Sequence, residues 1–384
     1  MTIALANARV LTPEGFADGR AVLIERGRIA GVMARDAIPS RTPTEDLGGL
    51  TLVPGFIDSQ LNGGGGVLFN DSPTVEAIAA IGAAHRRYGT TGFLPTLISD
   101  ELSVVRKGIE AVNTAIETGI PGVLGIHIEG PFLNVDRKGI HAKAKLRTLD
   151  DEGFVTVTGL KRGRTLVTLA PERTTPEMIR RLVSAGVIVA AGHTDGTYAE
   201  IRTALNNGLS GFTHLFNAMS PLGSREPGAV GAALEDADSW CGLIVDGRHI
   251  HPVTMRLALC CKPADRFMLV TDAMPSVGAA DKHFILQGQP VHVVDGVCVN
   301  ADGTLAGSDL DMAAAVQNSV AMLGVDLAVA IRMASINPAR FLGIDADTGA
   351  IASGLKADLV LLDRAGNVVK SWISGRAAEA AVPR

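Results

Sequence analysis

Polar residues that could do chemistry stand at the ends of several short apolar runs in this sequence. Glu129 lies at the end of "GVLGIHIEG", His193 at the end of "GVIVAAGHT" and Asp272 at the end of "RFMLVTDA". His214 lies within "GFTHLFN", and His249 comes shortly after "CGLIVDG". One carboxylate and two imidazoles that converge from separate strands are the ligands expected for a catalytic zinc with a fourth position open for water. We therefore predict that Glu129, His193 and His214 hold one metal ion.

Asp272 is predicted to act as the general base and acid beside that metal. A bound metal lowers the pKa of water to about 7, so hydroxide becomes available at neutral pH. A nearby carboxylate can take the water's proton and pass it to a leaving nitrogen. A single histidine at a strand end is more often a structural residue, and a lone aspartate there is more often a helix cap. The coincidence of such residues at five runs favours a site.

The other histidines are weaker candidates for a metal-binding or catalytic role. His127 precedes Glu129 by two residues, so strand alternation turns both side chains to the same side. His127 is therefore either a partner of the ligands or a substitute for one of them. His85 lies in an amphipathic helical stretch, and His251, His283 and His292 lie in helix-start or hairpin contexts, so we assign these four to structure.

The apolar runs alternate with helical stretches from residue 53 to about residue 273, as eight parallel strands of a (β/α)₈ barrel would. They span residues 52–61, 91–97, 122–130, 165–172, 186–194, 211–217, 241–247 and 266–273. Helical patterns at 72–89, 175–186 and 197–208 lie between them. A doubly wound open sheet is the alternative, but "GGGG" at 63–66 fits neither G-x-G-x-x-G nor a P-loop. We predict an α/β protein with a TIM-like barrel whose strand ends form the site.

Both ends of the chain differ from the middle. Residues 1–50 and 350–381 alternate apolar and polar residues between glycine turns, which predicts antiparallel β-structure. We expect a small β-sandwich domain from residues 1–52 and 346–384, and a barrel domain from residues 53–345. A further antiparallel patch is predicted at 283–300, where "VVDGVCV" is typical of a hairpin near the barrel mouth.

Composition excludes several partners. No apolar run approaches the roughly 20 residues of a membrane span, and a net charge of −5 without basic blocks argues against a nucleic-acid surface. The N-terminal segment lacks the pattern of a secretory signal, so a cytoplasmic location is expected. The four cysteines contain no C-x-x-C pair and are predicted to be buried thiols.

Motifs along nearly the whole chain resemble those of the N-acetylglucosamine-6-phosphate deacetylases, a family of the amidohydrolase superfamily. The motifs are "PGFIDSQLNGGGG", "GIHIEGPFLN", "KGIHA", "AGHTDGTY", "FTHLFNAMSPLGSREPG", "IVDGRHIHP", "LVTDAM", "LAGS", "NPAR" and "GLKADLVLLD". The resemblance implies hydrolysis of the N-acetyl group of N-acetyl-D-glucosamine 6-phosphate to D-glucosamine 6-phosphate and acetate.

The resemblance also gives a meaning to Gln60 and Asn62. Most amidohydrolases carry His-x-His at this place, where both imidazoles bind one metal of a two-metal site. Neutral amides are poor zinc ligands beside imidazole, so we expect one divalent metal per subunit. Zn²⁺ is expected, and the ligand set also accepts Fe²⁺, Mn²⁺ or Co²⁺. Gln60 either hydrogen-bonds to the metal–water network or has a structural role at the strand end.

Further roles follow from the resemblance, residue by residue. His141 would polarise the acetyl carbonyl and stabilise the oxyanion, and His249 would contact the sugar. The remaining substrate-binding residues would be Ala142, Asn217, Ala218, Arg225 and Leu305, of which Asn217, Ala218 and Arg225 would bind phosphate. A homodimer is expected, because some of the family's substrate contacts cross a subunit boundary.

Two alternatives to this function stay open at the sequence level. One keeps the chemistry and changes the substrate to a related N-acetylhexosamine phosphate or an N-acyl amino acid. The other is a non-catalytic binding protein with the amidohydrolase fold. Against the second alternative, Glu129, His193, His214 and Asp272 are all present.

Overall fold

A barrel of eight parallel strands forms the larger part of the molecule, and it is confirmed by the structure, a computed structural model that describes residues 2–379. In chain order the strands are β6 (Phe56–Leu61), β9 (Thr90–Ile98), β10 (Gly125–Glu129), β11 (Arg164–Leu169), β12 (Ile188–Ala191), β13 (Gly211–Phe212), β14 (Trp240–Leu243) and β15 (Phe267–Leu269). Each strand pairs with the next one in the chain. A parallel bridge from Leu61 to Ala273 joins the first strand to the segment after the last, so the sheet closes and is not the open, doubly wound alternative.

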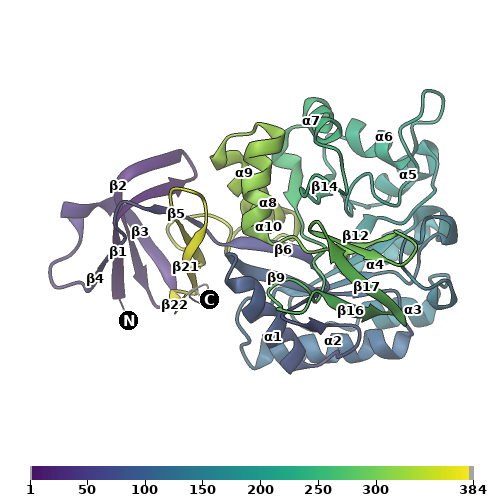
Figure 1. Ribbon diagram of the computed structural model, residues 1–384, viewed down its shortest axis with the longest axis horizontal. Helices are drawn as coiled ribbons and strands as arrows, with labels where there is room; N and C mark the ends of the chain where they lie inside the picture. The colour runs from purple at the N-terminus through teal and green to yellow at the C-terminus, as the bar shows by residue number, and fades with distance from the viewer. Residues whose placement is uncertain (1, 380–384) are drawn as a thin grey trace.

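Helices surround the barrel (Figure 1). They are α1 (Val75–Arg86), α2 (Leu102–Glu117), α3 (Asp151–Val157), α4 (Pro176–Ser184), α5 (Tyr198–Leu205), α6 (Gly228–Glu235), α7 (Pro252–Cys261), α8 (Met312–Asn318), α9 (Leu327–Ala334) and α10 (Ile336–Phe341). The three helical patterns read from the sequence correspond to α1, α4 and α5. Each of these begins after a threonine whose side chain accepts a backbone N–H bond: Thr74, Thr175 and Thr197.

Strands from both ends of the chain form a separate sheet beside the barrel, where both termini also lie (Figure 1). They are β1 (Thr2–Thr12), β2 (Gly15–Glu25), β3 (Arg28–Ala34), β4 (Thr44–Asp46), β5 (Thr51–Pro54), β20 (Leu359–Leu362), β21 (Val368–Ile373) and β22 (Arg376–Glu379). Hydrogen bonds connect them into one sheet, so the predicted sandwich of two layers is not confirmed. The boundaries at 52/53 and 345/346 stay a prediction, and residues 1 and 380–384 lie outside the described range.

The first predicted run, residues 52–61, is divided between the two sheets. β5 pairs with β1 and β20 in the terminal sheet, whereas β6 pairs with β9 in the barrel. Gly55 separates them, and a Cβ at Gly55 would lie 2.0 Å from the Thr91 hydroxyl oxygen. The chain can therefore pass from one sheet to the other this close to β9 only without a side chain.

The predicted hairpin patch is a four-stranded antiparallel sheet, which we call the hairpin sheet. It consists of β16 (His283–Leu286), β17 (Gln289–Val294), β18 (Val297–Asn300) and β19 (Leu305–Ser308). Asp295 and Gly296 connect β17 to β18 with φ of +50° and +79°, as a tight hairpin turn requires. A short pair, β7 (Gly63–Gly64) and β8 (Val67–Leu68), follows the first barrel strand.

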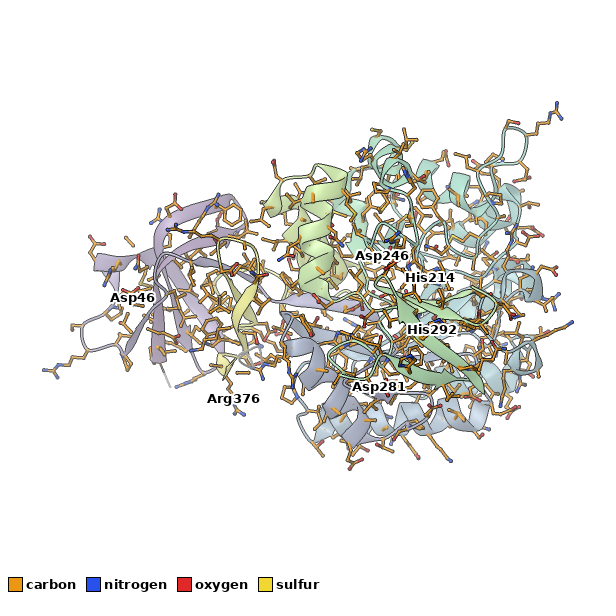
Figure 2. The ribbon with its side chains drawn as sticks, in the orientation of Figure 1. Asp46, His214, Asp246, Asp281, His292 and Arg376 are labelled. Carbon is orange, nitrogen blue, oxygen red and sulfur yellow. The ribbon has the colours of Figure 1, made fainter. Side chains whose placement is uncertain are left out.

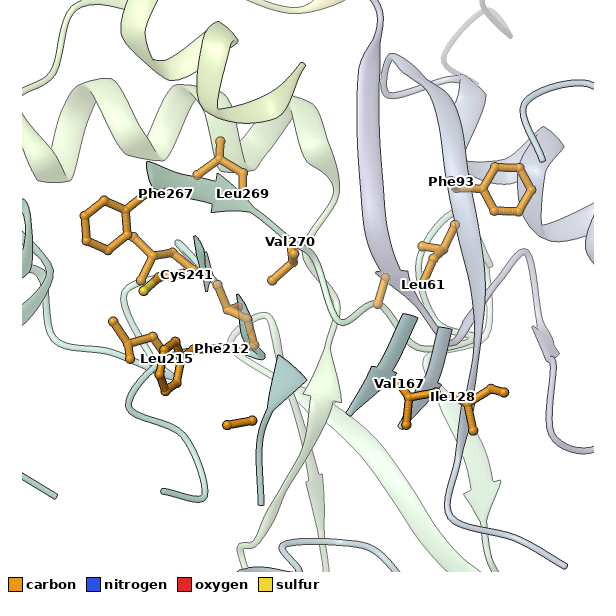
Figure 3. Close-up of a cluster of buried hydrophobic side chains, with 14 of the residues drawn as sticks. Leu61, Phe93, Ile128, Val167, Phe212, Leu215, Cys241, Phe267, Leu269 and Val270 are labelled. Carbon is orange, nitrogen blue, oxygen red and sulfur yellow. The ribbon is translucent and has the colours of Figure 1, made fainter. Parts of the chain in front are cut away.

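Buried aliphatic and aromatic side chains pack inside and around the barrel (Figure 3). Cys241 belongs to this core and Cys298 to a smaller cluster under the hairpin sheet, as predicted. For Cys260 and Cys261 the prediction of burial is wrong, because both are exposed at the end of α7. Within residues 2–379, no helix is long and apolar enough to cross a membrane.

Candidate metal-dependent active site

A cavity of about 320 Å³ opens at the carboxyl ends of the barrel strands. Ten of the residues singled out from the sequence line it: Asn62, Glu129, His141, His193, His214, Asn217, Ala218, His249, Asp272 and Leu305. The hairpin sheet also contributes to the wall through Leu286, Leu305 and Ala306. Figure 2 shows His214 and Asp246 in the barrel, and His292 on the hairpin sheet that overlies it in this view. The cavity therefore lies between the barrel and the hairpin sheet.

Three buried side chains meet at the base of this cavity. The Glu129 Oε1 atom lies 2.9 Å from His214 Nε2 and 3.2 Å from His193 Nε2, and the two Nε2 atoms are 3.1 Å apart. Zinc bonds of about 2.0–2.1 Å in a tetrahedral site would place ligand atoms about 3.3 Å from one another. The observed triangle is close to that size, so Glu129, His193 and His214 fit a single small divalent ion.

His193 is fixed in the tautomer that a metal ligand needs. Its Nδ1 atom lies 2.9 Å from the backbone oxygen of Arg137. A carbonyl oxygen only accepts hydrogen bonds, so Nδ1 carries the proton and Nε2 turns its lone pair towards Glu129 and His214. A hydrogen bond of this kind from the far ring nitrogen is the usual support of a metal-bound histidine.

Four of the predicted site residues have backbone φ angles that L-residues rarely adopt. His193, His214 and Asp272, which follow barrel strands, have φ of +48°, +33° and +52°, and Ala218 has φ of +51°. Such conformations cost on the order of 1–3 kcal/mol each and gather at functional sites, where the surrounding structure holds them. For the first three residues the strain lies at the ends of β12, β13 and β15, where the chain turns each side chain into the cavity.

Asp272 is held through one carboxylate oxygen only. Its Oδ1 accepts hydrogen bonds from Gln60 Nε2 at 3.0 Å and from Asn62 Nδ2 at 2.6 Å. Across the described chain, no hydrogen bond reaches Oδ2, which leaves that oxygen available for proton transfer. Burial and the negative charge of Glu129 raise the pKa of Asp272 to about 6. Gln60 also donates to Glu129 Oε1 at 3.2 Å, so its amide separates two carboxylates.

His141 presents a hydrogen-bond donor to the cavity. Its Nδ1 accepts the backbone N–H of Ser99 at 3.2 Å and lies 2.7 Å from the Ser99 hydroxyl. Burial, assisted by His193, lowers the pKa of His141 to about 3, so the ring is neutral. Because Nδ1 is the acceptor, the single ring proton sits on Nε2. Sequence reasoning missed Ser99, although it directly follows β9 and so stands at a strand end like the ligands.

His249 is oriented by a carboxylate that the sequence reading did not single out. Its Nδ1 lies 2.6 Å from Asp246 Oδ2, and its backbone N–H bonds to the other oxygen of Asp246 at 2.9 Å. Asp246 ends the seventh apolar run, so its position at a strand end was the available signal. The contact leaves the Nε2 atom of His249 for a ligand in the cavity.

Four predicted site residues do not line the cavity. Gln60 lies behind it, in contact with Glu129 and Asp272. His127 bonds to Thr168 and Thr96 at 2.8 and 3.3 Å, so both ring nitrogens face hydroxyl groups and not the cluster. Ala142 follows His141, with its N–H bonded to Gln287. Arg225 is exposed on the segment before α6.

The fold and the cluster together are those of a hydrolase-type (β/α)₈ barrel with a candidate metal site. A model of the amidohydrolase family matches residues 51–378. The chain belongs to the amidohydrolase family.

Similar proteins narrow this assignment. An N-acetylgalactosamine-6-phosphate deacetylase of Shewanella sp. (strain ANA-3) is 41% identical over 96% of this chain and 94% of its own length. An N-acetylglucosamine-6-phosphate deacetylase of Haemophilus influenzae is 34% identical over 98% and 99%. The crystal structure of the Pasteurella multocida N-acetylglucosamine-6-phosphate deacetylase superposes with a TM-score of 0.96 at 33% identity, covering 99% of this chain and all of that one. The resemblance predicted from the motifs is confirmed, and the chain is an enzyme of this deacetylase group.

Proposed function

We propose that this protein hydrolyses the N-acetyl group of N-acetyl-D-glucosamine 6-phosphate, giving D-glucosamine 6-phosphate and acetate. The observation that carries the proposal is the meeting, in one cavity, of a Glu–His–His cluster, a carboxylate with one free oxygen and a neutral imidazole donor. These are the groups that amide hydrolysis requires: an activated water, a proton carrier and a stabiliser of the oxyanion.

Glu129, His193 and His214 would hold one divalent ion, Zn²⁺ or a similar metal. Such an ion supplies Lewis-acid activation of water at neutral pH. Asp272 Oδ2 accepts the proton of the attacking water and later donates it to the amine nitrogen, while Gln60 and Asn62 hold Oδ1 in place. Asn62 Oδ1 is buried and has no partner among the described residues, so it offers an acceptor to a substrate N–H.

His141 acts on the acetyl carbonyl in this proposal. Its Nε2–H donates to the carbonyl oxygen and strengthens that bond as negative charge develops. The cavity wall nearby includes the apolar side chains of Ile98, Met274 and Leu286, which suit a methyl group. Leu305 at the start of β19 belongs to the same wall.

The phosphate end of the site includes one predicted ligand, Arg225, that the cavity of a single chain does not contain. Asn217 and Ala218 line the cavity and can face a phosphate, but Arg225 lies outside it and is exposed. The segment that carries Arg225 projects beside α6 (Figure 1). Leu222 on this segment and Leu257 on α7 are 60% and 61% exposed, so each offers apolar surface to a second copy. We propose that these side chains join two copies, and that Arg225 of each copy reaches the cavity of the other.

A second candidate substrate is the galactosamine epimer. It is favoured by the Shewanella relative, 41% identical, which is named for N-acetylgalactosamine 6-phosphate. The two sugars differ only in the configuration at C4, far from the acetyl group, so the same cluster would serve both.

The test is acetate release from both epimers, with metal content measured on the same sample. We expect rapid release from the glucosamine substrate with about one metal per chain. Faster release from the galactosamine epimer would shift the assignment to the second candidate. A metal-loaded protein that releases no acetate from either sugar would contradict the proposed function and leave other N-acyl substrates, such as N-acyl amino acids, to be examined.

A further inference from the structure

The tip of the hairpin sheet touches the segments that hold His141. Gln287 and Gly288 connect β16 to β17 with φ of +50° and +82°. Although it lies at a hairpin tip, the Gln287 side chain is half-buried and turned towards the barrel. Its Oε1 accepts the N–H of Ala142 at 2.6 Å, and its Nε2 donates to the backbone oxygen of Ser99 at 2.7 Å.

These two contacts lie on either side of His141. Ala142 is its neighbour in the chain, and Ser99 is the residue whose N–H and hydroxyl hold its Nδ1. Gln287 therefore fixes the backbone of Ser99, which anchors the ring, and the backbone directly after His141. These segments lie 188 and 145 residues away from Gln287 in the sequence, and the packing of the hairpin sheet against the barrel brings them together.

The backbone at Gln287 adds an independent argument. A left-handed conformation is unfavourable for a residue with a long side chain, by roughly 1–2 kcal/mol. The next hairpin tip of the same sheet, Asp295–Gly296, has nearly the same φ angles and uses a residue pair that tolerates them. Glutamine at position 287 is not explained by the turn, but it is explained by its two contacts.

We propose that Gln287 is a positioning residue that couples the packing of the hairpin sheet on the barrel to the orientation of His141. Gln287 holds Ser99 and Ala142 in place, and His141 thereby keeps its proton on Nε2. The catalytic part of this inference rests on the proposed function, because it takes His141 as the donor to the carbonyl.

The test compares Gln287→Asn with the wild-type protein. Asparagine accepts a left-handed backbone more readily than glutamine, so the turn should be retained, but its side chain is one methylene too short to span both contacts. We expect kcat to fall about tenfold or more, as a misplaced catalytic group predicts, with metal content and thermal stability unchanged. Gln287→Glu, which keeps the acceptor but places an oxygen against the Ser99 carbonyl, should also lower kcat. Asp295→Asn at the next tip is the matched control and should be active.

A spectroscopic readout separates this inference from the proposed function. In protein labelled with ¹⁵N-histidine, the His141 signals, assigned with a His141→Gln variant, report which ring nitrogen carries the proton. We expect the Nε2–H form in the wild type and a mixture of tautomers in Gln287→Asn, whether or not either protein releases acetate. A wild type that is inactive on both sugars would overturn only the proposed function. Wild-type kcat together with unchanged His141 signals in Gln287→Asn would overturn the positioning role.

Discussion

The carboxylate of Asp272 contacts side-chain amides, whereas that of Glu129 contacts the two histidines of the cluster. The Oδ1 atom of Asp272 accepts two amide hydrogen bonds, from Gln60 and Asn62, and its Oδ2 accepts none from the residues that the structure describes. The side-chain amides of Gln60 and Asn62 both donate to Asp272, and that of Gln60 also donates to Glu129, so the amides lie between two carboxylates that would otherwise repel one another. The two amides thus fix Asp272 beside the Glu129–His193–His214 cluster.

Replacing Asp272 by asparagine tests its proposed role as the proton carrier with little change of shape. An asparagine Oδ1 can accept the same two hydrogen bonds, but its amide cannot take a proton. Turnover should fall at least about a hundredfold, the scale of a lost general acid–base, while metal content and substrate affinity stay near their wild-type values. The measurements are kcat, metal per chain and a substrate binding isotherm. A turnover within about threefold of the wild type would refute the assignment.

Glu129 should be required for the metal, because its Oε1 atom is the shared contact of both histidines. We expect Glu129→Ala to lose its metal on dialysis, measured by elemental analysis of the dialysed protein. His127→Asn serves as the control. Its imidazole contacts Thr96 and Thr168, so this variant should keep its metal. Retention by Glu129→Ala, or loss by the control, would move the ligand role to His127.

At the scale of elements, the positions of residues at strand ends explain which parts of the candidate site could be predicted from the sequence. Glu129, His193 and Asp272 were predictable because a parallel barrel turns the last residue of each strand towards one opening. Ser99 and Asp246 occupy equivalent places, but serine is common in turns, and at the seventh run His249, three residues after Asp246, was singled out instead. Gln287 could not be predicted, because its partners are set by how the hairpin sheet packs and not by its neighbours in sequence.

The boundary between the terminal sheet and the barrel could not be predicted either, because it also depends on tertiary contacts. Residues 52–61 read as one apolar strand, since both halves are buried, and only Pro54–Gly55 marks the crossing from β5 to β6. The close approach of Gly55 to Thr91 is a tertiary contact. A local pattern therefore predicts that strands exist here, but not to which sheet each one belongs.

The loop after β6 depends on α1, and this contact predicts a pH effect. His85 of α1 donates from Nε2 to the Gly63 oxygen at 2.9 Å, beneath the glycine run. Burial lowers its pKa to about 4, partly offset by that hydrogen bond. Its unfolded-state pKa is about 6.5, so below pH 6.5 the unfolded chain binds a proton that the folded protein does not. Stability from this group is present above pH 6.5 and is lost as pH falls through 4.

His85→Gln keeps a donor for the Gly63 oxygen but does not titrate. Between pH 7 and pH 5 the wild type should lose about 2 kcal/mol more unfolding free energy than this variant does. Denaturant unfolding at both pH values measures the difference. His127 and His141 are present in both proteins, so their titration cancels in the comparison. Equal losses in the two proteins would show that His85 does not titrate in this range.

At the scale of the whole molecule, the one arginine among the described residues that line the cavity, Arg137, is already paired with Asp195 at 2.7 Å. His249 lies in the cavity of its own chain, whereas Arg225 lies on an exposed segment outside it. A planar guanidinium that forms two charge-assisted bonds is well suited to a phosphate. If Arg225 is used, it must come from another copy, and a two-fold dimer would supply two such contacts at once.

Mixing two inactive variants tests this arrangement directly. Asp272→Asn lacks the proton carrier but has Arg225, and Arg225→Ala has the reverse. In a mixed dimer, the chain with an intact Asp272 faces the intact Arg225 of its partner, so one of the two sites is complete. Unfolding and refolding an equal mixture makes half of all dimers mixed, so activity should return to about a quarter of the wild-type value. If Arg225 served its own chain, every site in the mixture would lack one group, and activity would stay at the level of the separate variants. An unphosphorylated N-acetylhexosamine is the control substrate, because its turnover should not depend on Arg225.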